Sequence, residues 1–106
     1  ERARKSPLRA PMIIVAVAKM TEHAKVPAME QRLSAGCSAY AILLSAEAFN
    51  YAGIWRTGDA SRDPHVAKSL GLEKNEEIIG FLYLGTRIGE PKVPDKNIPE
   101  NCLSHW

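Results

Sequence analysis

The side chains best suited to chemistry in this sequence stand together just before Gly58. Trp55 offers an aromatic plane, Arg56 a fixed cation with a fork of N–H donors, and Thr57 a hydroxyl. Such a fork binds carboxylates and phosphates in a bidentate manner. The pattern therefore indicates a site for an anionic or carbonyl-rich ligand. The competing interpretation is that Trp55 serves only the core, as most large aromatic side chains do.

Other patterns that often mark active sites are incomplete. Residues 53–58 have the GxxxxG spacing of a phosphate-binding loop but lack the Lys and Ser or Thr that should follow, and no GxGxxG motif opens a helix. His23, His65 and His105 have no partners at the spacing of a metal site. Cys37 lies among small residues inside a predicted helix, which is typical of a buried structural cysteine.

The elements that must position these residues follow from the apolar pattern. The run from Met12 to Ala18 is continuous and partly β-branched, which predicts a central strand covered on both faces. From Ala28 to Phe49 nothing but Gly36 interrupts a long helix, and its apolar residues occupy more than one stripe. We therefore expect a core helix surrounded by other elements.

The second half of the chain predicts two further strands and a short helix. Asn50 is a suitable C-cap because it tolerates the left-handed conformation, and Ile54-Trp55 is a short apolar strand. Asp63 and Pro64 have the signature of a helix start, and Gly71 ends that helix. A buried middle strand is expected over residues 78–86.

Glycine and proline punctuate the C-terminal third. Gly80, inside the predicted strand, indicates a bulge or a close backbone approach. Prolines at 91, 94 and 99 predict an extended arm over residues 87–106. The order strand, helix, strand, helix, strand indicates layers with helices on both faces of a partial sheet.

Composition narrows the function classes. The 106 residues carry fourteen basic and twelve acidic side chains, and beyond the N-terminus the basic ones do not cluster, so a nucleic-acid partner is not expected. Cys37 and Cys102 form no disulfide or zinc pattern, and no apolar run approaches the ~20 residues of a membrane helix. We expect no membrane association and a cytoplasmic protein.

Three segments together resemble a known family. These are RAPMIIVAVAK, KVPAMEQRLSAGCSAYAILLSAEAFNYAGIWRTG and EEIIGFLYLGT. They are similar to the C-terminal half of short, YdjA-type members of the nitroreductase family. The resemblance implies an α+β fold, a nitroreductase-like three-layer α/β/α sandwich. In this chain the fold would be partial, with a long central helix and about three strands. Residues 1–106 would form the C-terminal part of a single domain and residues 87–106 its arm.

The resemblance also implies a function. Family members are homodimers that hold flavin mononucleotide (FMN) at the subunit interface, and they transfer hydride from NADH or NADPH to small acceptors such as nitroaromatics or quinones. Arg56 would stabilise negative charge on the reduced flavin or its phosphate, and Trp55 would wall the pocket. The residues implied in cofactor binding are Trp55, Arg56 and Thr57 for FMN and Ser45, Ala46, Glu47, Ala48, Phe49 and Asn50 for the nicotinamide nucleotide.

Two departures from the family pattern bear on this expectation. Asn50 stands where relatives usually have Gly. The family's N-terminal Arg-Ser-rich segment, which grips the FMN phosphate, is not among these residues. The alternative is therefore a truncated, non-catalytic fragment or interaction half-domain that cannot retain FMN alone.

Overall fold

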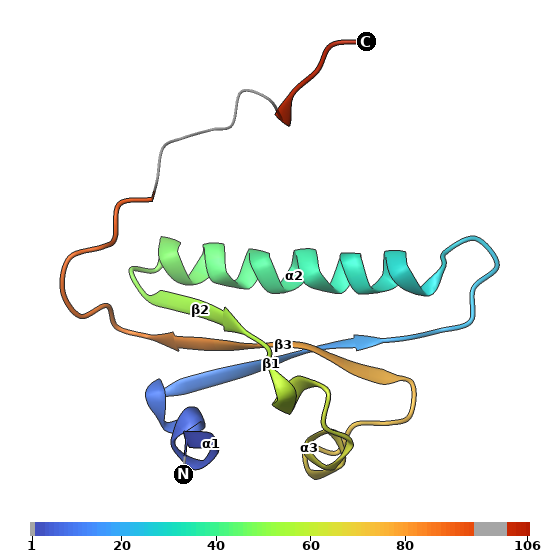
Figure 1. The fold of residues 1–106 in the computed structure, drawn as a ribbon, viewed down its shortest axis with the longest axis horizontal. Helices are drawn as coiled ribbons and strands as arrows, with labels where there is room; N and C mark the ends of the chain where they lie inside the picture. Colours follow the sequence, from blue (N-terminus) through green and yellow to red (C-terminus); the bar gives the residue numbers. More distant parts are fainter. Residues whose placement is uncertain (1, 95–101) are drawn as a thin grey trace.

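A three-stranded antiparallel sheet with one long helix on it organises the chain. The computed structural model describes residues 2–94 and 102–106. The strands are β1 (Met12–Lys19), β2 (Ala52–Arg56) and β3 (Glu76–Gly85), and both β1 and β2 pair with β3. The middle position expected for the strand over residues 78–86 is confirmed. Figure 1 shows helix α2 (Ala28–Ala48) lying along one face of this sheet.

On the opposite face, the described residues form only short elements. Figure 1 shows α1 (Arg2–Lys5) and α3 (Pro64–Ser69) on the side away from α2. The remaining elements are the 3-10 turns η1 (Ser6–Arg9) and η2 (Asp59–Ser61). In α3 the Asp63 carboxylate accepts a hydrogen bond of 2.8 Å from the His65 backbone N–H, so the predicted cap is confirmed. The predicted α+β class with helices on both faces is also confirmed.

The sequence-based prediction gave the first strand the wrong position in the sheet. Met12–Ala18 was expected to be central, but among the described residues β1 is an edge strand paired with β3 alone. Met12 is 57% exposed, whereas Ala18 is buried. A continuous apolar run reports that the faces of a strand are covered in part. It carries no information on whether both edges are paired.

Helix α2 is less enclosed than its composition suggested. Its buried residues are Ala39 and Ala46. Leu33, Tyr40 and Leu44 remain 63%, 57% and 54% exposed. The expectation of a helix surrounded on all sides is wrong within the described residues, because one apolar stripe packs on the sheet and another faces outward.

The predicted arm follows β3. Residues 87–94 contain no helix or strand, and residues 95–101 lie outside the described part of the chain. The start of the arm is fixed to α2, since Arg87 Nη2 lies 2.8 Å from Oε2 of Glu47. The arm as a whole stays a prediction.

Candidate functional site

Strand β2 separates the two side chains that the sequence suggested would act together. Successive side chains of a strand point to opposite faces of a sheet. Trp55 is paired with Leu82, which is fully buried, whereas Arg56 is paired with Phe81. The side chains of Trp55 and Arg56 therefore lie on opposite faces and do not converge on one point, which corrects the sequence-based expectation.

Trp55 packs between α2 and β3. Its Cη2 atom lies 3.7 Å from the position a Cβ would take at Gly36 of α2. A Cβ at Gly80 of β3 would overlap the indole nitrogen and lie 2.6 Å from Cδ1. Gly80 thus leaves the space that the ring occupies. The predicted close backbone approach is confirmed. A bulge is present at the same place, because Ala16 pairs with Gly80 but Val17 pairs with Ile78, which leaves Ile79 of β3 as the extra residue.

Trp55 also borders an apolar groove beside α2. This groove measures 660 Å³, and its lining includes Met29, Leu33 and Tyr40. Its charged lining residue is Arg32, which is bound to Glu77 through Nε–Oε2 and Nη2–Oε1 contacts of 2.6 and 2.8 Å. The hydrogen bond from Arg32, with its charge, holds the pKa of Glu77 below its ordinary value, although partial burial opposes this. The positive charge of Arg32 is thereby neutralised by the Glu77 carboxylate.

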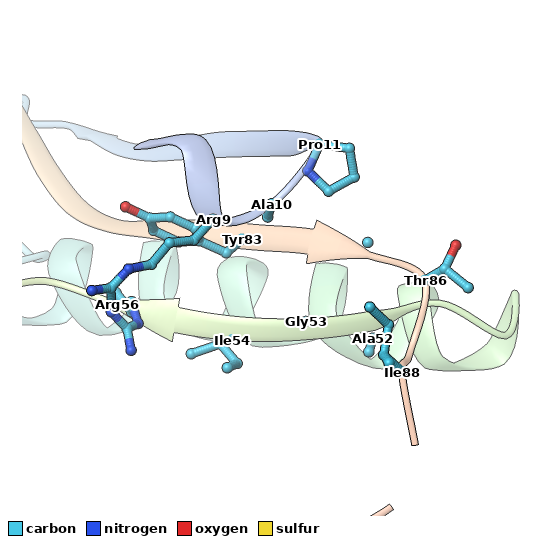
Figure 2. Close-up of a pocket in the computed structure, with 11 residues that line it drawn as sticks. Arg9, Ala10, Pro11, Ala52, Gly53, Ile54, Arg56, Tyr83, Thr86 and Ile88 are labelled. Atoms are coloured by element: carbon cyan, nitrogen blue, oxygen red, sulfur yellow. The ribbon is translucent and has the colours of Figure 1, made fainter. Parts of the chain in front are cut away.

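Arg56 lies on the other face, over Tyr83. Its Cζ atom is 5.8 Å from the centre of the Tyr83 ring, within the range of a cation–π contact. Figure 2 shows Arg56, Arg9 and Tyr83 at one end of a groove of 310 Å³, with Ala52 and Ile88 at the other. Among the described residues, no carboxylate forms an ion pair with Arg56 or Arg9.

Thr57 follows directly where β2 ends. It is exposed and precedes Gly58, whose φ of 84° is in the region that favours glycine. The Ser61 hydroxyl donates a 2.8 Å hydrogen bond to the Gly58 carbonyl and holds the turn. The Thr57 hydroxyl and the end of β2 are therefore accessible to a ligand.

The segment from Ser45 to Asn50 forms the far end of the same region. It is joined to the start of β2, and the five residues of β2 extend about 3.3 Å each, so Arg56 lies about 13 Å from Ala52. Asn50 has a φ of 63°, which confirms the predicted left-handed end of α2. The Tyr51 N–H donates to the Ala46 carbonyl at 2.9 Å, and that of Asn50 donates to Glu47, also at 2.9 Å. These bonds complete a Schellman motif.

Within this segment the side chains differ in availability. Ala46 is buried, and the Ser45 hydroxyl donates to the Ala41 carbonyl at 2.9 Å. The Glu47 carboxylate accepts hydrogen bonds from the Arg87 guanidinium. Ala48 and Phe49 are exposed, Phe49 by 75%. The structure thus separates these six predicted residues from Arg56, although β2 connects them.

Sequence reasoning missed residues that the fold brings to the site. Arg9 and Tyr83 gather with Arg56, yet they come from three distant parts of the chain. Alternation along β3 was a usable signal for Tyr83, but none marked Arg9. The sequence assigned Gln31 no role beyond its place in the segment that resembles the nitroreductase family. Its amide binds the backbone of Thr21 twice and the Val26 carbonyl, each at 2.9 Å, and so orders the loop before α2.

The positions of the candidate metal ligands and of Cys37 can be compared with the sequence-based expectations. No group of three or more His, Cys, Asp or Glu residues within the described ranges could hold a metal ion. Cys37 is exposed rather than buried, because it faces the apolar groove beside α2. None of the helices among the described residues has the length and hydropathy of a membrane-spanning segment.

The fold and the position of β2 define a nitroreductase-like α+β class. The crystal structure of a nitroreductase-like family protein from Bacillus cereus superimposes with a TM-score of 0.79, covering 99% of this chain and 59% of that one at 16% identity. A sequence model of the Nitroreductase family matches residues 1–86. The chain belongs to the nitroreductase family.

Two curated relatives share more sequence with it. YdjA of Escherichia coli (strain K12), named as a candidate NAD(P)H nitroreductase, is 46% identical over 86 residues, 81% of this chain and 47% of YdjA. A Haemophilus influenzae protein with the same candidate activity is 37% identical over 79 residues, 74% of this chain and 43% of that protein. The chain spans about half the length of the curated relatives it matches.

Proposed function

We propose that this protein is the C-terminal part of an FMN-dependent NAD(P)H oxidoreductase that passes hydride to nitroaromatic or quinone-type acceptors. Membership of the nitroreductase family and the names of the two curated relatives support an oxidoreductase. The observation that carries the flavin proposal is Arg56. It is an accessible guanidinium at a strand end, held over an aromatic ring and without a carboxylate partner among the described residues.

The residues present fit one side of a flavin site. FMN is planar and anionic, and the groove at Arg56 combines a guanidinium with apolar walls, among them Ile54. When bound, FMN supplies the hydride chemistry between the nicotinamide and the acceptor. Arg56 would bind negative charge on the cofactor, and Thr57 would donate or accept a hydrogen bond beside it.

Trp55 would act differently from its neighbour. Because its ring is enclosed by Gly36 and Gly80 on the α2 side, it fixes the position of β2 and so of Arg56. The Trp55 side chain also lines the apolar groove beside α2, where Leu33 and Tyr40 are exposed. We infer that this apolar face of α2 is covered in a homodimer. The nicotinamide nucleotide would then contact the exposed Phe49 end of α2.

The first prediction tests Arg56. In the flavin-binding protein, Arg56→Ala is expected to weaken FMN binding by about tenfold or more, because a hydrogen bond to a charged group contributes about 1.5–3 kcal/mol. The unfolding temperature should change little, since the side chain is exposed. Flavin fluorescence titration measures the affinity. Arg62→Ala, which removes an exposed arginine that does not line the groove, is the matched control. Equal FMN affinity in Arg56→Ala and wild type would sink this role.

A second candidate function is a non-catalytic interaction half-domain. The observation that favours it is that the matched region is 47% of YdjA, so residues of the other half of such relatives are expected to contribute to cofactor retention. Adding FMN to the purified chain and recording its visible spectrum separates the candidates. A bound yellow flavin with NAD(P)H consumption supports the enzyme, and a colourless, inert protein supports the half-domain.

A further inference from the structure

A single side chain holds the loop between β1 and α2. Residues 21–26, the 21–26 loop, are all exposed and contain no helix or strand. The Gln31 amide nitrogen donates hydrogen bonds of 2.9 Å to the carbonyls of Thr21 and Val26, the first and last residues of this loop. The Gln31 amide oxygen accepts a third hydrogen bond, also of 2.9 Å, from the Thr21 N–H. Gln31 therefore closes the loop across its base.

The loop has few other attachments. Within the described part of the chain its one further hydrogen bond is local, from the Lys25 N–H to Nδ1 of His23 at 3.2 Å. If the three bonds to Gln31 break, the 21–26 loop keeps no hydrogen bond to α2 or to the sheet among the described residues. The side chain of one residue thus decides whether this loop stays on the body of the protein.

The chain on both sides of the loop is held by other contacts. The Met20 N–H donates to the Asn75 carbonyl at 2.7 Å, and the Met20 carbonyl accepts a 2.9 Å hydrogen bond from Nδ2 of Asn75. On the other side the Glu30 N–H donates to the Pro27 carbonyl at 3.0 Å, in the first turn of α2. None of these bonds involves the side chain that closes the loop. The 21–26 loop can therefore separate while its flanks stay in place.

We propose that the 21–26 loop is a conformational device that opens as one unit, without unfolding of the sheet or of α2, and that Gln31 holds it closed. Segments with exposed hydrogen bonds and few buried contacts open at a lower free energy than the whole fold. Three bonds of modest net strength keep the open form a minor state. The loop lines neither groove described above, so the proposal does not rest on flavin binding or on the homodimer.

The second prediction uses amide hydrogen exchange of the wild-type chain in low concentrations of urea, followed by NMR. The Thr21 N–H is expected to exchange at a rate that hardly depends on urea, because opening this short loop exposes little surface. Exchange of the β3 amides should accelerate with urea, as global unfolding does. An equal urea dependence for Thr21 and β3 would mean that the loop separates only when the sheet unfolds, which overturns the proposal.

Variants of Gln31 identify the group that holds the loop. In Gln31→Ala the Thr21 N–H should exchange about tenfold faster or more, as the loss of three hydrogen bonds requires. Helix α2 is not weakened by this change, because alanine has the highest helix propensity. The Met20 N–H should change by less than about twofold. Glu30→Ala truncates the neighbouring exposed side chain and is the matched control, with Thr21 exchange within about twofold of wild type.

Gln31→Glu separates closure of the loop from protection of one amide. This change keeps an oxygen for the Thr21 N–H but replaces the donor to the two carbonyls with a second oxygen, so the loop should open and Thr21 exchange should still accelerate. Wild-type exchange in Gln31→Glu would show that the Thr21 bond alone protects that amide, and it would overturn the role of Gln31 in closing the loop.

Trypsin tests whether the loop opens as a unit. The rate of cleavage after Lys25 should rise in Gln31→Ala by the same factor as Thr21 exchange, because both report one opening equilibrium when reclosing is fast. Cleavage after Lys19, at the end of β1, should keep its wild-type rate. Mass spectrometry of the fragments measures both rates. Unchanged cleavage after Lys25 together with faster Thr21 exchange would contradict opening of the loop as a whole.

Discussion

Trp55 lies near two glycines, Gly80 and Gly36, which differ in how much room they leave beside the indole ring. Gly80 provides space on the strand side, where a Cβ would overlap the indole, while a Cβ at Gly36 on the helix side would make an ordinary 3.7 Å contact. The sequence predicted a bulge or a close backbone approach at Gly80. The sequence could not show that Trp55 is the side chain that approaches Gly80, because this contact joins two strands whose register depends on the whole sheet.

The third prediction compares alanine at these two positions. Gly80→Ala is expected to lower the free energy of unfolding by about 1–3 kcal/mol, because the added methyl forces the indole or the strand to move. Gly36→Ala should raise it by about 0.5–1 kcal/mol, because Ala is favoured inside a helix and finds room. Urea unfolding followed by Trp fluorescence measures both. A Gly80→Ala variant as stable as Gly36→Ala would contradict this account of the packing.

Among the elements, α2 is joined to the sheet by one ion pair near its start and one near its end. Arg32 binds Glu77 of β3, and Glu47 binds Arg87 just after β3. The bounds of α2 were predictable, since the segment after Pro27 favours helix and Asn50 adopts the left-handed conformation that ends it. The ion pairs were not, because pairing depends on which charges the tertiary fold brings together.

The fourth prediction follows from the lowered pKa of Glu77. A carboxylate whose pKa is lowered by folding stabilises the folded state above its unfolded pKa, and this contribution is lost as the pH falls through the folded pKa. Because the pair is partly exposed, Glu77→Gln should lower the unfolding temperature by only roughly 1–5 °C at neutral pH. The difference from wild type should vanish toward about pH 2, where both carry a neutral side chain.

Thermal unfolding by circular dichroism across this pH range measures the effect. Glu22→Gln is the control, since Glu22 is exposed and the described residues supply it with no ion-pair partner. It should leave the unfolding temperature within about 1 °C of wild type. A Glu77→Gln difference that persisted unchanged at the acid end would show that the pair is not its cause.

At the scale of the whole molecule, the two faces of the sheet are chemically different. The α2 side exposes Leu33, Tyr40 and Leu44 beside a groove whose arginine is paired with Glu77. On the other side Arg9 and Arg56 have no carboxylate partner within the part of the chain that the structure describes. Composition and periodicity predicted the layers. They did not separate the faces, because assigning Trp55 and Arg56 to opposite sides requires the strand bounds. The sequence suggested only the apolar pair Ile54-Trp55, whereas β2 extends through Arg56.

The fifth prediction concerns the proposed homodimer. Leu33→Glu places a charge on the exposed apolar face of α2 and is expected to shift a dimer toward monomer, because an unpaired charge is costly to bury. Size-exclusion chromatography with light scattering measures the mass. Leu70→Glu makes the same change at a leucine that is 48% exposed just beyond α3, and it should leave the mass unchanged. A wild-type chain that is monomeric at all concentrations, or a Leu33→Glu dimer, would contradict the assignment.

The space above Gly80 also decides which face of the sheet becomes charged. A slip of β2 by one residue along β3 would exchange the sides of Trp55 and Arg56, moving the guanidinium under α2 and the indole to the opposite face. In the observed pairing the indole lies over Gly80, and a Cβ at Gly53 would lie 2.6 Å from Cδ2 of Leu43 and 2.8 Å from Cδ2 of Leu84. We therefore expect the fit of the ring over Gly80 to favour the alignment that leaves Arg56 on the face away from α2.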